Sequence, residues 1–239
     1  MNKTGELLKL SGTIRNYRCT RAAASFVFTD PDRSWMGVVA IAAGLAGLSG
    51  PAVATASGAN DMEEQADYVE FDLDDQPVKG WLWRSPFKEG DRVNVAAEWV
   101  GDHYEAGGIA RPEDRTVALH PHCSRARTRH IKNAVKWWFI GATASNMLGL
   151  FMMFLVWGTE DFLDAVIDPF GYAASFVYGF LGLVTISLAR QWMPFVRLSE
   201  KVFRTLGLPD PGNIDLVKSS KAQRRPDDPA EFGTFYFRY

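Results

Sequence analysis

The sequence predicts an α+β membrane protein, in which a small β-barrel or sandwich of the OB or SH3 type is joined to an α-helical transmembrane hairpin. Short strand-like segments with turn signals recur about every ten residues in the first half of the chain. Two later runs of about twenty residues contain no charged side chain. The 239 residues suffice for one or two domains with a substantial core.

The β domain is predicted over residues 1–34 and 61–123. Residues 5–30 alternate between apolar and polar side chains, as a half-buried strand does. The pattern resumes in the segments YVEFDL, VKGWLW, RVNVAAEWV, HYEAGGIA and RTVALHPH, and turn-forming residues separate them. A Lys-Glu-Gly-Asp turn leads into the Val-x-Val of the third segment. This arrangement is common in OB-like and SH3-like barrels.

An uncharged segment of mostly Ala and Gly interrupts the β domain, and we assign residues 35–60 to it. A single membrane crossing here would place residues 61–122 outside and separate the two halves of the β domain. We therefore expect a helical hairpin or kinked segment, broken at a Gly-Pro pair and packed through closely spaced small residues. The residues concerned are Gly44, Gly47, Gly50 and Pro51. It could pack on the barrel, dip into the membrane surface or mediate assembly.

The transmembrane hairpin is predicted from residues 137–157 and 170–189, both free of charge. At a rise of about 1.5 Å per residue, the first helix would be roughly 31 Å long, which is enough to cross the hydrocarbon core. Buried helices of soluble proteins seldom lack every charge over such a length. Residues 124–207 are therefore assigned to a basic flank, the hairpin and a basic juxtamembrane helix.

The charges around the hairpin predict its orientation. The connecting loop carries only acidic charges, whereas both outer flanks are basic. By the positive-inside rule, a protein inserted by its own cell has both termini in the cytoplasm; a chain inserted from the other side by a secretion machine need not obey it. The residues expected to set orientation and contact lipid headgroups are Arg125, Arg127, Arg129, Lys132, Lys136, Arg190 and Arg197. The formal net charge of −2 does not point to a nucleic-acid partner.

Small residues recur at every fourth position on both predicted helices. They are Gly141, Ser145 and Gly149 on the first, and Gly171, Ser175 and Gly179 on the second. Such stripes let helix backbones approach closely in lipid. They could pack against each other inside one hairpin, or form the interface of a homo-oligomer. Asn146 could bond across helices, line a wet path or be structural.

Residues 208–239 are predicted to be a linker followed by an aromatic C-terminal strand. The segment up to about residue 233 is rich in Pro and charge, which is typical of linkers. The last six residues read TFYFRY. An exposed aromatic end would be an unprotected apolar patch, so we expect it to dock on a barrel edge or on a partner.

The sequence contains no signature of catalysis, and we expect neither an enzyme nor a cofactor. A nucleophile elbow, a phosphate loop, a zincin motif and paired carboxylates at diagnostic spacing are all missing. His120, His122 and Cys123 are possible zinc ligands, but no second ligand pair stands at a diagnostic spacing, so we expect no metal. Cys19 and Cys123 could form a disulfide or remain reduced thiols. Two cysteines far apart in the sequence do not indicate a fold held together by several disulfides.

Five stretches resemble a family of small membrane proteins described as type VI secretion system effectors. They are MGVVAIAAGLAGLSGPAVATASGAN, EEQADYVEFDLDDQPVKGWLWRSPF, HCSRARTRHIKNAVKWWFI, RQWMPFVRLSEKVFRTLGLPDPGNIDLVKSSK and FGTFYFRY. The resemblance covers most of the chain and is weakest in the two helices and their loop. It implies a toxin that acts at the inner membrane of a recipient bacterium, or a component of that system, and supplies no catalytic residue.

The expected partners follow from this resemblance and from the hairpin. They are the lipid bilayer, further copies of the chain, and a cognate immunity or secretion-system protein. The N-terminal residues lack an apolar stretch followed by a cleavage site, so we expect no secretory signal peptide, in agreement with export by such a system. The alternative is a resident inner-membrane immunity or adaptor protein whose β domain or tail binds a partner.

Overall fold

The computed structural model describes residues 7–24, 64–157 and 169–239. The inserted segment predicted over residues 35–60, with Gly44, Gly47, Gly50 and Pro51, lies outside the described residues, as does the acidic loop. The chain forms two compact units. One comprises Met1–Arg127 with Met193–Tyr239, and the other Thr128–Trp192.

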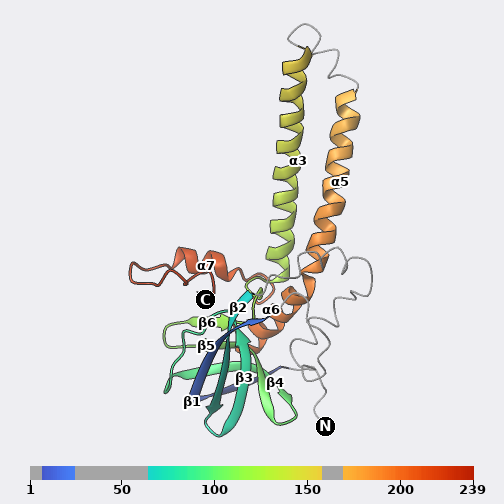
Figure 1. The fold of residues 1–239 in the computed structure, drawn as a ribbon. Helices are drawn as coiled ribbons and strands as arrows, with labels where there is room; N and C mark the ends of the chain where they lie inside the picture. Colours follow the sequence, from blue (N-terminus) through green and yellow to red (C-terminus); the bar gives the residue numbers. More distant parts are fainter. Residues whose placement is uncertain (1–6, 25–63, 158–168) are drawn as a thin grey trace. The chain divides into compact units, whose positions relative to one another are not determined.

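Five strands of the first unit form a closed β-barrel. They are β1 (Leu8–Ala24), β2 (Glu64–Leu73), β3 (Gln76–Leu82), β4 (Arg92–Val100) and β5 (His103–Arg111). β1 pairs with β4 and with β2, β2 with β3, and β4 with β5, all antiparallel, while a parallel pairing of β3 and β5 closes the barrel (Figure 1). Of the two expected barrel types, this Greek-key connectivity is that of the OB type.

The long strand β1 pairs with two neighbouring strands because it bends in its middle. Residues Leu8–Thr13 of β1 pair with β4, and residues Ile14–Ala24 pair with β2. The register shifts between Arg15 and Arg18, and Asn16 between them has a φ of 54°. Such a bulge bends a strand and increases its twist, which lets one strand turn a barrel corner.

The barrel core is built from the alternating apolar residues of these strands. Val69 and Phe71 of β2, Val78 and Leu82 of β3, and Ile109 of β5 are all buried. The alternate positions face outward, because successive side chains of a strand point to opposite faces. The period-2 pattern of the sequence therefore accounts for the core in β2 and β3, whereas β4 and β5 bury consecutive residues, because helix α6 also packs on these two strands.

Gly80 allows β3 and β5 to close the barrel, and we predict that Gly80→Ala destabilises it by about 2 kcal/mol through overpacking. A Cβ at Gly80 would lie 2.8 Å from the backbone oxygen of Ala106 and 3.0 Å from its Cβ, so the strands would have to separate. Gly108→Ala is the comparison, since its Cβ would have its close contacts with side-chain carbons of Leu119 and Val202, both at 2.7 Å, and would lie 3.6 Å from the nearest backbone atom, the Ala118 oxygen. Chemical denaturation of both variants in detergent measures the difference; an equal or larger loss for Gly108→Ala would contradict this account.

Two further strands extend the sheet beyond the barrel. β6 (Thr116–Leu119) pairs with β5, and β7 (Tyr236–Arg238) pairs with β6. The helix α7 (Leu216–Ala222) packs on β7, where the hydroxyl of Ser220 accepts a bond from the Arg238 backbone N–H (2.8 Å). The aromatic tail thus docks on the extended edge of this chain's own sheet, one of the two locations expected.

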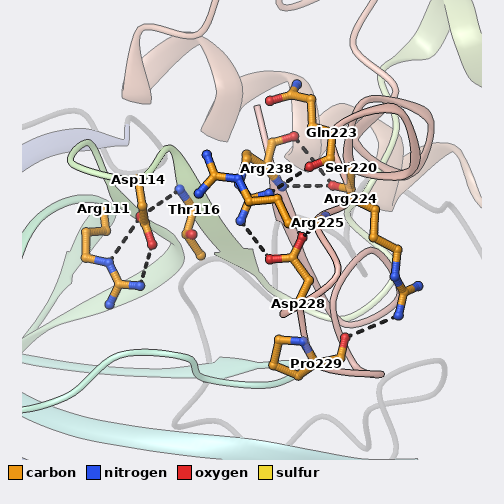
Figure 2. A network of polar contacts seen from close by, with 10 residues as sticks. All are labelled: Arg111, Asp114, Thr116, Ser220, Gln223, Arg224, Arg225, Asp228, Pro229 and Arg238. Atoms are coloured by element: carbon orange, nitrogen blue, oxygen red, sulfur yellow. Dashed lines mark hydrogen bonds and ion pairs between the residues drawn. The ribbon is translucent and has the colours of Figure 1, made fainter.

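An ion pair fixes this tail. The Arg238 guanidinium donates to the Asp228 carboxylate at 2.9 Å, and Figure 2 shows the two side chains pointing toward each other. The guanidinium also lies 4.5 Å from the ring centroid of Phe232, a cation–π distance. In the same view, Arg111 forms a second pair with Asp114 at 2.7 Å near the start of β6.

Helix α6 (Met193–Leu206) covers part of the barrel. It packs on β1, β4 and β5 through an apolar face that includes Leu198, Val202 and Phe203, all fully buried (Figure 1). These residues recur at the helical spacing of three to four, so they form one stripe. Its opposite face carries the charged residues.

The second unit is a pair of helices. They are α3 (Arg127–Trp157) and α5 (Pro169–Gln191). The predicted uncharged runs at 137–157 and 170–189 both lie inside them. α3 begins ten residues earlier than its uncharged run, because the basic residues that precede the run are good helix formers and do not end a helix.

Candidate functional site

The two helices of the second unit are long and apolar enough to cross a membrane. The segments concerned are Arg127–Val156, with 30 residues, and Gly171–Gln191, with 21. Only 11% of the most apolar window of the first is buried, and 0% of the second. The exposed large apolar side chains include Trp137, Phe139, Leu148, Phe151 and Leu155 on α3, and Phe176, Phe180 and Leu183 on α5. A core helix of a soluble protein would bury these side chains.

The two helices contact each other through a small aromatic and polar cluster. The indole Nε1–H of Trp138 donates to the backbone oxygen of Tyr178 at 3.0 Å, and the two rings meet edge to face. The hydroxyls of Thr143 and Tyr178 lie 2.9 Å apart. Gly182 makes room for this contact, because its Cβ would lie 3.3 Å from the Trp138 Nε1. Nearer the other end, His130 Nε2 lies 3.1 Å from the Ala189 carbonyl oxygen.

The predicted small-residue stripes take no part in this contact. A Cβ placed on Gly141, Gly149, Gly171 or Gly179 would have nothing within 4 Å. Ser145 and Ser175 are exposed. The interpretation in which the two stripes pack against each other inside one hairpin therefore does not describe this structure. The rotation of each helix, fixed by the Trp138–Tyr178 contact, turns its stripe to the outside.

Asn146 does not bond across the helices. Its side chain is only 7% exposed, and its Nδ2–H donates to the backbone oxygen of Ala142 in the same helix at 2.9 Å. This is a local helix contact of a kind that polar side chains make in apolar helices. The geometry gives Asn146 a structural role.

The predicted basic residues lie on three helices, except Arg125, which precedes the first of them. Arg125 is paired with Asp215 at 3.5 Å just before α3, and the backbone N–H of Arg127 donates to the Glu200 carboxylate at 2.8 Å. The others are Arg129, Lys132 and Lys136 on α3, Arg190 in the last turn of α5, and Arg197 on α6. Apart from Arg129, which is half-buried, these others are exposed.

His120, His122 and Cys123 pack against α6. Burial lowers the pKa of His120 to about 4 and raises the pKa of Cys123 to about 12, so imidazole and thiol are neutral at pH 7. His122 meets Trp83 and Phe195 ring to ring, and the Cys123 thiol lies 3.6 Å from the Phe195 carbonyl oxygen. Among the described residues, no three His, Cys, Asp or Glu side chains are grouped to hold a metal. Cys19 and Cys123 are both free thiols, one exposed and one buried.

The structure also contains a pair of buried carboxylates that we did not predict from the sequence. Glu98 of β4 stands opposite Glu105 of β5, and their side chains are buried. Burial raises the pKa of Glu105 to about 8, against a smaller lowering influence of Lys79. His103 Nε2 lies 3.4 Å from the Glu105 carboxylate, while its Nδ1 lies 2.6 Å from Asp102. The two-residue turn Gly-Asp between the strands already implied this register, and counting outward from it would have revealed the pair.

Two candidate sites result from the described residues, the buried carboxylate pair and the apolar helix pair, and the helix pair offers the larger surface for binding. The carboxylate pair can hold a proton in the fold, and the hairpin can present a continuous apolar surface with two outward stripes of small residues. Comparisons with protein-family models, with curated proteins and with solved structures found no match for this chain.

Proposed function

We propose that this chain is a bacterial membrane protein that inserts its α3–α5 hairpin into an inner membrane, associates there with further copies and permeabilises the bilayer. The action is non-enzymatic. The observation that carries the proposal is the exposure of two long apolar helices, of which 11% and 0% of the most apolar windows are buried. Removing such surface from water is favourable by about 25 cal/mol per Å² of apolar area, and a bilayer core is the medium that matches its length.

The outward stripes support association between copies. In lipid, helix contacts depend on close backbone approach, which Gly and Ser permit. Each hairpin carries two stripes, one on α3 and one on α5, and neither is used inside the hairpin. A unit with two such surfaces can join a neighbour on either side, so association can close into a ring.

The sequence resemblance to type VI secretion system effectors supports a recipient cell as the location of this proposed activity. The membrane of that cell would be entered from the periplasmic side. In that setting the β-barrel unit would be the part that a cognate immunity or secretion-system protein recognises.

A resident inner-membrane immunity or adaptor protein is the second candidate. The basic flanks at both ends of the hairpin favour it, because a positive-inside pattern is what ordinary insertion by the cell's own machinery requires. The barrel and the docked tail would then bind the partner in the cytoplasm.

We expect the full chain to collapse the membrane potential of a bacterium when it is directed to the periplasm. A triple substitution of Gly141, Ser145 and Gly149 to Leu should abolish the collapse, because branched side chains keep the backbones apart. The measurement is potential-sensitive dye fluorescence together with viability, with and without an export signal.

The matched control replaces Met147 and Phe151 of the same helix with Leu, which keeps the helix apolar and leaves the stripe intact. It should retain full activity. If the chain is harmless in both compartments and instead protects against a co-expressed toxin, the adaptor or immunity function replaces the permeabilising one.

A further inference from the structure

Three segments that are distant in sequence meet on one side of the barrel unit. The backbone N–H of Ala126 donates to the Ile214 oxygen at 2.9 Å, and that of Leu216 to the Ser124 oxygen at 3.1 Å. The N–H of Arg127 donates to Glu200 on α6 at 2.8 Å. The start of α3, helix α6 and the start of α7 are thereby held together.

These segments carry a set of cations that we call the basic collar. Its members are Arg127, Arg197, Lys201, Arg204, Lys218 and Lys221. All are exposed except Lys201, which is half-buried. None forms an ion pair with another residue of the ranges that the structure describes.

The fold does not need these charges. Arg197, Lys201 and Arg204 recur at the helical spacing of three to four, so they form one stripe on α6, outside the buried face that packs on the barrel. Glu200, the acidic residue of α6, already accepts the Arg127 N–H. Unpaired like charges side by side on a helix repel one another, and an external anion would offset this repulsion.

Two members of the collar lie close in the chain to the ends of the hairpin helices. Arg127 is the first residue of α3, and α6 begins at Met193, two residues after α5 ends at Gln191. Wherever the hairpin enters a bilayer, the chain holds Arg127 and Arg197 near its surface, and the other collar residues share their unit with these two. The phosphates of anionic lipids stand at that surface and attract juxtamembrane cations.

We propose that the basic collar is a binding surface for anionic phospholipid headgroups, and that it anchors the barrel unit to the membrane surface. This inference rests on the proposed membrane insertion of the hairpin. Arg197 and Arg204 contact phosphate oxygens in bidentate fashion, as guanidinium groups do, and the lysines add point charges.

The test uses the full-length protein in an uncharged detergent. Dioctanoyl phosphatidylglycerol and dioctanoyl phosphatidylcholine are titrated in parallel, and bound lipid is counted by native mass spectrometry. We expect a clear preference for phosphatidylglycerol. Substituting Arg197, Lys201 and Arg204 with Gln should weaken its binding by about fivefold per charge removed. The conservative variants Arg197→Lys and Arg204→Lys should retain most of it, which separates loss of charge from loss of fold.

A control of equal charge uses exposed cations of the barrel, with Arg15, Lys88 and Arg92 changed to Gln. Equal binding of the two lipids, or an equal loss in this control, would overturn the proposal. So would displacement of the lipid by a DNA oligonucleotide at lower concentration, which would make the collar a nucleic-acid surface. Alkaline extraction of cell membranes reports hairpin insertion separately: a chain that is extracted refutes the proposed function, whereas an inserted chain without lipid preference refutes the collar alone.

Discussion

Replacing Glu105 with Gln should stabilise the barrel unit at pH 8 and above by roughly 4 kcal/mol, and have little effect at pH 4. The carboxyl is buried, and its pKa rises from 4.5 to about 8 in the folded protein. A group whose folded pKa is raised binds its proton more tightly in the folded state. The stability that protonated Glu105 contributes is fully present below the pKa that this carboxyl has in the unfolded chain, and it is lost as the pH rises toward 8. Gln mimics the protonated acid and removes this loss.

The measurement is chemical denaturation of the full-length protein in detergent between pH 4 and 9, followed by near-UV circular dichroism. The wild-type chain should lose stability steadily across this range, and Glu105→Gln should show a flatter profile. Glu70→Gln is the control, because Glu70 stands on the neighbouring part of the sheet, is half exposed and pairs with Lys79 at 3.3 Å. A profile for Glu105→Gln that parallels the wild type would show that the buried carboxyl does not control the pH dependence.

The strand pattern predicted most of the barrel, but not its closure. Alternating apolar residues such as Val69 and Phe71 identify strands and inward faces, since the side-chain period of a strand is two. The parallel pairing of β3 with β5 depends on the close approach of Gly80 to Ala106, two residues far apart in sequence. No local pattern reports such a contact, so the OB and SH3 types could not be distinguished beforehand.

In the helical unit, likewise, local sequence features predicted the helices but not the direction in which their stripes point. The absence of charge predicted both helices, and the spacing of Gly141, Ser145 and Gly149 predicted a stripe. Where that stripe points depends on helix rotation, which the contact between Trp138 and Tyr178 determines across 40 residues of sequence. The basic collar likewise depends on hydrogen bonds such as that of Ala126 to Ile214, which the sequence does not encode locally.

Asp228→Ala should release the C-terminal strand and destabilise the barrel unit by roughly 3 kcal/mol, because it leaves a buried guanidinium without its carboxylate. The side chains of Arg238 and Asp228 are 9% and 10% exposed, and Arg238 also donates to the Gln223 carbonyl oxygen at 2.9 Å. With Asp228 removed, the guanidinium either stays uncompensated or turns to water, and we expect the turn to water to loosen the pairing of β7 with β6. Asp227→Ala is the matched control, because Asp227 is the exposed neighbour of the same charge and size.

The strand release is measured by hydrogen exchange of the C-terminal peptide and by its cleavage with carboxypeptidase. Both should accelerate in Asp228→Ala and remain unchanged in Asp227→Ala. Hydrogen bonds from Arg238 hold the pKa of Asp228 below its usual value, so this contribution to stability is present above about pH 4 and is lost as the pH falls through the lowered pKa. The wild-type tail should therefore lose its protection in acid, and the Asp228→Ala tail should not change further. Equal protection of the two tails at neutral pH would mean that β7 is held by its backbone pairing and aromatic contacts alone.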